Sequence, residues 1–256
     1  MIGISQKPSI QLEGSPIKTE INKMVYEDLV NSDSKYIVVN QQNQQILLKK
    51  SFFKNNKQVQ NVIRYIGLFD GSQVTVENYS NEEIHSKYKK SKSIVIILES
   101  PHIDEYEANV EKLTPIAPAQ GQTGKKIERH IDSLMYLLSL FNVIEEQHMY
   151  RIIIMNAISY QTSLYHIHKQ NMNNAYRELR DKVWMKMWSE IPQIKSDFLQ
   201  QISSLKKHSI IINACPKSLK PFVNQELLPY AERYSLFECN HPSSTEIWTK
   251  SLFKMN

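Results

Sequence analysis

The sequence predicts an α/β fold, a three-layer sandwich with a mostly parallel central sheet, together with a small β-containing N-terminal module. From residue 93 onward, short β-branched runs alternate with helical patterns. These runs are almost wholly apolar, as is typical of parallel strands that are covered on both faces. Polar residues follow three of the runs directly. Because ligands of open α/β sheets bind at the carboxyl ends of the strands, we expect the functional site there.

Residues 1–90 differ from the remainder in their pattern of apolar and polar residues, and we expect them to form the N-terminal module. The segment VIRYIGLFDGSQVTVENY carries Asp70-Gly71 between two β-prone halves, which is typical of a hairpin. The charged segment 80–92 is typical of a solvated linker. We therefore expect a boundary near residue 90 and a larger α/β domain over 91–256.

Four runs of the larger domain are expected to be strands: residues 94–98, 151–156, 209–215 and 234–240. One clear helical pattern lies between the first two, and its apolar face consists of Ile127, Ile131, Leu134, Leu138 and Phe141. Three of the runs end in side chains that can do chemistry, namely Glu99-Ser100-Pro101-His102, Asn156 and the segment NHPSS at 240–244. These side chains should meet at one edge of the sheet.

Two of the chain's 6 glycines, Gly121 and Gly124, stand in the segment PIAPAQGQTGKKI just before the predicted helix. Glycines there allow close backbone approach, and a helix N-terminus favours an anion such as phosphate. A simple tight turn is the alternative. The nucleotide-binding P-loop motif is excluded because it would need Gly and Ser or Thr where the chain has Ala119 and Lys126.

Composition narrows the class of protein. A formal net charge of +5 is compatible with a polyanionic partner such as DNA. No run approaches the ~18 apolar residues of a membrane helix, so no membrane association is expected and the expected location is the cytoplasm. Cys215 and Cys239 are expected to be reduced thiols near strand ends, and His166 and His168 lack the further ligands of a metal site. We expect no metal, no cofactor and no obligate protein partner.

Four short motifs follow one another along the chain: ESPHIDE, PAQGQTG, IMNAI and HPSS. Together they resemble the motifs of the uracil-DNA glycosylase superfamily over about residues 93–248. In that family a polar motif follows the first core strand, an asparagine follows a later strand, and a His-Pro-Ser motif follows the last. The resemblance implies a DNA glycosylase that extrudes a base from the stack and cleaves its glycosidic bond.

The resemblance also assigns roles to residues. Glu99 is the first candidate for the carboxylate that stabilises the sugar cation or positions water, and Glu105 is the second. His241 would donate to the departing base, and Asn156 would read the edge of the base, with His102 and Ala119 lining the pocket. Phosphates would be held by Ser100, Gly121, Gly124, Ser243 and Ser244. The structural alternatives are a helix cap or turn for Asn156 and the serines, and an N-cap or surface ion pair for Glu105.

The chain departs from the family at four positions. Leu98 replaces the glycine that opens the first motif, and Ser100 replaces the water-positioning aspartate of the best-known uracil enzymes. His102 stands where a tyrosine excludes bases substituted at C5, and Ala119 stands where a phenylalanine stacks on the base. Both changes imply a roomier pocket for a modified base. Divergent members of the superfamily act in phage defence on glucosylated hydroxymethylcytosine, which gives one candidate substrate.

The expected function is therefore a monofunctional DNA glycosylase that acts on a modified pyrimidine, since no lysine is clearly placed to form a Schiff base. Two alternatives stay open. One is ordinary uracil repair, and the other is a catalytically silent DNA-binding protein that keeps the fold. An unrelated α/β hydrolase is disfavoured because the chain lacks a G-x-S-x-G elbow.

Overall fold

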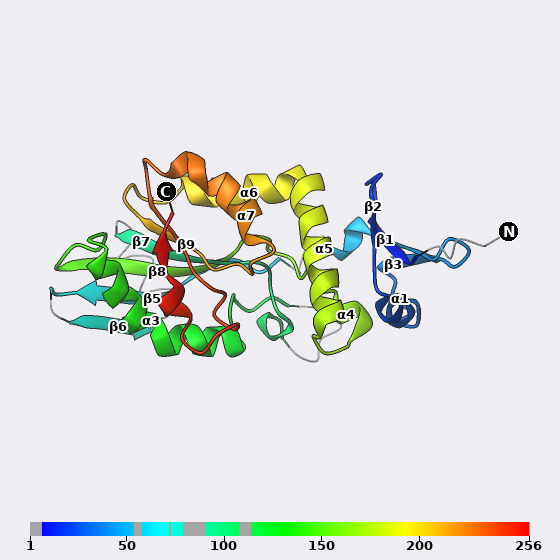
Figure 1. Cartoon of the computed structure of the whole chain (residues 1–256), viewed down its shortest axis with the longest axis horizontal. Helices are drawn as coiled ribbons and strands as arrows, with labels where there is room; N and C mark the ends of the chain where they lie inside the picture. The colour runs from blue at the N-terminus through cyan, green and yellow to red at the C-terminus, as the bar shows by residue number, and fades with distance from the viewer. Residues whose placement is uncertain (1–6, 54–57, 72, 79–90, 108–113, 256) are drawn as a thin grey trace.

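The computed structural model describes residues 7–53, 58–71, 73–78, 91–107 and 114–255. Within these residues the fold is mixed α/β, with helices and two mixed sheets (Figure 1). The larger sheet has seven strands in the order β11-β10-β9-β7-β8-β5-β6, and the smaller has four in the order β2-β1-β4-β3. Most of the expected linker, residues 80–90 of 80–92, lies outside the described residues.

Four neighbouring strands at the centre of the larger sheet are parallel. They are β7 (Lys92–Leu98), β8 (His148–Asn156), β9 (Ile210–Asn213) and β10 (Ser235–Glu238). All four strands expected from the apolar runs are thereby confirmed. The register pairs Leu98 with Asn156 and Ile97 with Asn213, so the carboxyl ends of β7, β8 and β9 lie at one edge. The polar residues that follow them are brought together there.

Antiparallel strands extend this sheet at both sides. β5 (Val62–Phe69) pairs with β8 and forms a hairpin with β6 (Val74–Asn78), which confirms the predicted turn. The turn is closed by the N–H of Asp70, which donates to the carbonyl of Gln73 at 3.1 Å, and Gly71 adopts a positive φ of 100°. Because β5 pairs along β8, β5 and β6 belong to the larger sheet, although they lie within residues 1–90, the range expected for the N-terminal module. At the other edge β11 (Phe253–Lys254) pairs with β10.

Helices cover both faces of the larger sheet. On one face lies α3 (Gln122–Leu140), whose buried side chains pack against alternate residues of β7 and β8. The opposite face is covered by α6 (Pro192–Ser203) and α7 (Lys220–Leu227), while α5 (Asn174–Glu190) stands beyond the carboxyl ends of the strands (Figure 1). These three helices share a core with the other alternate residues of the strands. A sheet buried on both faces explains why its central strands are apolar throughout.

The face of α3 follows the predicted spacing with one exception. Ile127, Ile131, Leu134 and Leu138 are buried, whereas Phe141 is 40% exposed. The helix ends at Leu140, so Phe141 no longer continues its buried face. The ring of Phe141 instead contacts that of Phe237 edge to face, with centroids 5.2 Å apart.

The N-terminal strands form the smaller sheet beside α1 (Lys23–Val30). These strands are β1 (Ser9–Leu12), β2 (Lys18–Glu20), β3 (Ile37–Asn40) and β4 (Gln45–Leu48). The sheet lies beyond α5 and the short α4 (Tyr165–His168), and its buried side chains belong to the same apolar cluster as those of α5 (Figure 1). The hydroxyl of Tyr176 on α5 donates to Asp28 on α1, which adds a polar contact. No helix in the described part of the chain is long and apolar enough to cross a membrane.

Candidate active site

A cavity of about 260 Å³ lies where β7 ends, and it collects most of the residues singled out in the sequence. Segments far apart in the chain build its wall: the end of β7, the 3₁₀ turn η2 (Ile103–Glu105), the start of α3, α5 and the loop after β10. Of the eleven predicted site residues, eight line it: Glu99, Ser100, His102, Glu105, Ala119, Gly121, His241 and Ser243. The predicted convergence at the carboxyl ends of the strands is thus found in the structure.

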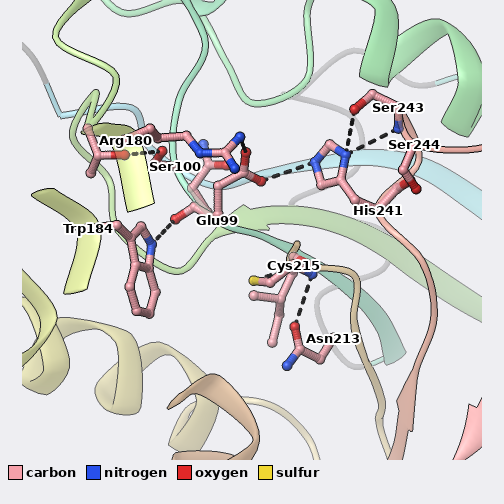
Figure 2. Close-up of polar contacts among 12 residues, drawn as sticks. Glu99, Ser100, Arg180, Trp184, Asn213, Cys215, His241, Ser243 and Ser244 are labelled. Carbon is pink, nitrogen blue, oxygen red and sulfur yellow. Dashed lines mark hydrogen bonds and ion pairs between the residues drawn. The ribbon is translucent and has the colours of Figure 1, made fainter. Parts of the chain in front are cut away.

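Glu99 is a buried carboxylate of this cavity and contacts an arginine and a histidine (Figure 2). Arg180 places Nη1 3.2 Å from Oε1, and His241 places Nε2 3.1 Å from Oε2. Burial raises the pKa of Glu99, but the charge and hydrogen bonding of His241 and the charge of Arg180 outweigh it and lower this pKa to about 2. Glu99 is therefore an ionised carboxylate held inside the protein at neutral pH.

The backbone at Glu99 is fixed as firmly as the side chain. The indole Nε1 of Trp184 donates to the Glu99 carbonyl at 2.7 Å (Figure 2). The N–H of Ile158 donates to the same oxygen at 3.1 Å. The side-chain Oε2 is buried, and its 3.1 Å contact with His241 Nε2 lacks the alignment of a full hydrogen bond among the described residues. That oxygen has bonding capacity left for a bound group.

His241 is oriented by its own loop. The backbone N–H of Ser243 donates to Nδ1 at 3.2 Å, and the Ser243 hydroxyl lies 2.7 Å from the same nitrogen (Figure 2). Because Nδ1 accepts a backbone hydrogen bond, the hydrogen-bond network assigns the proton of a neutral ring to Nε2, which faces Glu99. The hydroxyl of Ser244 donates to the His241 carbonyl at 2.7 Å, which stabilises the turn.

Glu105 and Asn156 form a buried pair that the sequence did not anticipate. Asn156 Nδ2 donates to Glu105 Oε2 at 2.9 Å, and both residues are almost fully buried. Burial raises the pKa of Glu105 to about 7, against the lowering effect of hydrogen bonds from the backbone of Ala119, from Asn156 and from the backbone of His102. Glu105 lines the cavity whereas Asn156 does not, so Asn156, the predicted base reader, lies behind the carboxyl group.

Two predicted lining residues, His102 and Ala119, leave the cavity open. The His102 side chain is 55% exposed and lies 3.3 Å from the Asp104 carboxylate, so it does not close the cavity. Ala119 is buried and adopts a positive φ of 56°, and its carbonyl accepts from Arg64 at 3.1 Å. Ser100 is buried, with its hydroxyl 2.8 Å from that of Thr162.

The two glycines before α3 have different surroundings. Gly121 lines the cavity and precedes the first turn of the helix, where the backbone N–H groups have no side-chain cap. Gly124 is buried and does not line the cavity. A Cβ at this position would stand 1.8 Å from the Ala119 carbonyl oxygen. Close packing of α3 on the Ala119 loop therefore explains Gly124.

A second cavity of about 560 Å³ adjoins the first and shares four lining residues with it: Arg177, Arg180, His241 and Ser243. Lys217 and Lys220 also line it, as does Ser244, and no acidic side chain does. Four cationic residues thus surround a polar cavity, which gives it a positive potential.

Sequence reasoning missed the cations of α5 and of the loop after β9. Arg177 and Arg180 stand three residues apart and share a helix face, which was the available signal. Arg180 also contacts the Asp181 carboxylate at 2.8 Å, so its guanidinium is held in place. Lys217 follows β9, so the strand-end argument applied to the third run would have found it.

The remaining candidates have structural contacts. Cys215 and Cys239 are free and buried, and burial raises the pKa of each thiol. Both are therefore protonated and poorly suited to act as nucleophiles. His168 stacks on Tyr176 and lies 2.9 Å from the Ser163 carbonyl, as expected of a packed histidine.

Comparisons with protein-family models, with curated proteins and with solved structures find no match to this chain. The arrangement itself combines a buried ionised carboxylate, an imidazole beside it, a carboxyl group with a pKa near neutrality and an adjoining cationic cavity. Such a set suits a reaction in which positive charge develops on one fragment and negative charge on the other.

Proposed function

We propose that the protein is a monofunctional DNA glycosylase that hydrolyses the N-glycosidic bond of a flipped-out modified pyrimidine and leaves an abasic site. The observation that carries this proposal is the ionised, buried Glu99 beside His241 at the wall of the cavity. The order of the motifs along the chain and the parallel centre of the sheet support a uracil-DNA glycosylase-like sandwich.

Glu99 would stabilise the sugar. As the bond between C1′ and the base nitrogen breaks, its electron pair leaves with the base and the sugar gains oxocarbenium character. A carboxylate in a water-poor site opposes that positive charge strongly. Since a pKa of about 2 makes Glu99 a weak base, its role is charge stabilisation and orientation of the water whose oxygen then bonds to C1′.

His241 would stabilise the departing base. His241 lines the cavity, and its Nε2–H, which faces Glu99 in the free protein, would turn toward the pyrimidine O2 when the base is bound, where negative charge gathers. The contact with Glu99 and the fixed Nδ1 contact with Ser243 both keep the ring in this tautomer. The proton released by the attacking water passes to solvent or to the departing base.

The adjoining cationic cavity would hold DNA. Arg177, Lys217 and Lys220 can neutralise phosphates without reading sequence, and the uncapped start of α3 adds backbone N–H groups. Gly121, Ser243 and Ser244 are close enough to these cavities to contribute. The formal net charge of +5 favours the same partner.

The space beyond the base favours a bulky substrate. A cavity of about 260 Å³ opens beside one of about 560 Å³, and neither His102 nor Ala119 blocks it with an aromatic ring. A substituent at pyrimidine C5 could occupy this space. Glucosylated hydroxymethylcytosine in phage DNA is such a base, and phage DNA would be met in the cytoplasm.

An abasic-site assay tests the proposal. The purified protein is incubated with unmodified DNA, uracil-containing DNA and phage DNA that bears hydroxymethylated or glucosylated cytosine, and abasic sites are revealed by alkaline cleavage. Alkali-labile sites confined to one modified DNA support the proposal, and sites in uracil DNA would favour uracil repair instead. DNA binding with every substrate intact would favour a silent DNA-binding protein, the alternative that the cationic cavity supports.

A further inference from the structure

Glu105, the last residue of the ESPHIDE motif, lines the cavity, whereas the predicted base reader Asn156 does not. Glu105 is only 3% exposed. Asn156 donates its Nδ2 to Glu105 Oε2 from behind at 2.9 Å. Asn156 therefore orients the carboxyl group.

The bonding capacity of Glu105 is partly filled by the protein. An ionised carboxylate has about four acceptor sites. The amide of Asn156 uses one of them at 2.9 Å, and hydrogen bonding from the backbone of Ala119 and of His102 lowers the pKa of the group. Glu105 lines the cavity, where its remaining acceptor capacity can meet a bound base.

We propose that Glu105 is the specificity-determining residue of this site and reads the exocyclic amino group at C4, so that the substrate class is a cytosine-type base. The inference rests on the proposed function. A carboxylate oxygen accepts from the N4 amino group of cytosine, which is a known mode of recognition. A uracil-type base places the oxygen O4 at that position, and two acceptors facing each other repel.

The discrimination depends on the protonation state of Glu105. When ionised, it only accepts, and it favours the amino base. When protonated, its O–H can donate and its other oxygen can accept, so it can match either type of base. With a pKa of about 7, the preference for the amino base grows as the pH rises above neutrality.

Other charged and titratable groups face the same cavity as Glu105. Glu99 raises the pKa of Glu105 through its charge. Other titratable or charged groups that line the cavity are His102, Asp104, Arg177, Arg180 and His241. An effect common to both substrates cancels in the ratio of their rates, so this ratio is the quantity that reports on Glu105.

The test uses two oligonucleotides with one target base in the same sequence, 5-hydroxymethylcytosine or 5-hydroxymethyluracil, which share the C5 substituent. Single-turnover base release is measured at pH 6 and pH 8.5 for the full-length wild-type protein, for Glu105→Gln and for Glu107→Gln. We expect the wild type to prefer the cytosine by about tenfold or more at pH 8.5, and by less at pH 6. Glu107→Gln, a change at an exposed neighbouring acid, keeps this pattern.

Glu105→Gln is the informative variant, because a neutral amide carries both a donor and an acceptor at every pH. Its preference should fall to about threefold or less and should not change with pH. An unchanged preference in this variant, or a wild-type preference for the uracil, overturns the inference.

Binding separates this inference from the proposed function. The same oligonucleotides with a 2′-fluoro sugar, which resists hydrolysis, are used to compare affinities. Base release without discrimination at C4 leaves the glycosylase proposal standing and removes the role of Glu105. If no base is released, discrimination in binding that is lost in Glu105→Gln still supports the role, and equal binding overturns it.

Discussion

His241 Nε2 lies 3.1 Å from Glu99 Oε2, although the two residues are 142 positions apart (241 − 99) and belong to loops that follow different strands. The parallel arrangement of β7, β9 and β10 brings these loops to one edge of the sheet. Arg180 reaches the other Glu99 oxygen from α5. The carboxylate is thus held between a guanidinium and an imidazole that come from two other segments, and the predictions below depend on that arrangement.

Arg180→Gln should move the acidic limb of the pH profile to higher pH. His241 and Arg180 both lower the pKa of Glu99, and removal of the guanidinium raises it again from about 2. Activity at pH 5 should therefore fall more than activity at pH 8. The dependence of kcat/KM on pH from 4 to 8 measures this. In Arg177→Gln, which removes a cation without an ion pair to Glu99, the position of the limb should stay; equal movement in both variants would contradict the account.

Glu105→Gln should make the protein more stable at alkaline pH. The unfolded carboxyl group ionises near 4.5 and the folded one near 7, so folding stability falls as the pH rises between these values. The raised pKa corresponds to roughly 3 kcal/mol. The gain in the free energy of unfolding should be larger at pH 8 than at pH 5, as measured by urea denaturation. The same gain at both pH values, or a gain in Glu107→Gln, would argue against the buried carboxyl group.

Arg177→Gln and Lys217→Ala should each weaken DNA binding at low salt. Both residues line the cationic cavity, and each phosphate contact that is lost should reduce the salt dependence of binding by about one unit of slope. Affinity is measured by fluorescence anisotropy over a series of salt concentrations. Lys207→Ala, an exposed lysine outside the cavity, is the control. Slopes that do not change in any variant would place the DNA elsewhere.

Gly124→Ala should destabilise the protein more than Gly121→Ala. A Cβ at position 124 would stand 1.8 Å from the backbone carbonyl of Ala119, which cannot turn away. At position 121 the nearest atom, at 2.0 Å, is a carboxylate oxygen of Asp104, a half-exposed side chain that can move. Overpacking of this kind costs about 1–3 kcal/mol, which urea unfolding can resolve. Equal losses in the two variants would show that the helix start has no tighter contact at Gly124.

The strands and the edge at which the site lies were predictable from the sequence. Apolar runs such as residues 94–98 become buried strands because helices cover both faces of the sheet. Glu99 and His241 follow two of the runs, so a parallel sheet has to bring them close. The hairpin at Asp70-Gly71 was equally clear, since local turn chemistry determines it.

The sheet membership of β5 and β6 and the cations of α5 were not predictable in the same way. The sequence of a hairpin does not indicate which sheet the hairpin joins. Here β5 pairs with β8, which is distant in the sequence. Arg177 and Arg180 look like ordinary surface charges until α5 is packed beside the end of β7. Glu105 lines the cavity and Asn156 lies behind it because of the directions in which the two side chains point. The spacing of residues in the sequence does not give these directions.

Quantification of free base released by the wild type and by Glu99→Gln is the most direct test of the central claim. Both proteins are incubated in excess with phage DNA that contains the modified base, and the released base is measured by mass spectrometry over time. We expect the wild type to release the base and Glu99→Gln to be slower by about a hundredfold or more, since an electrostatic stabiliser is lost. Glu232→Gln, at an exposed position, should match the wild type. Equal release by wild type and Glu99→Gln, or no release by the wild type from any DNA, would contradict the role assigned to the buried carboxylate.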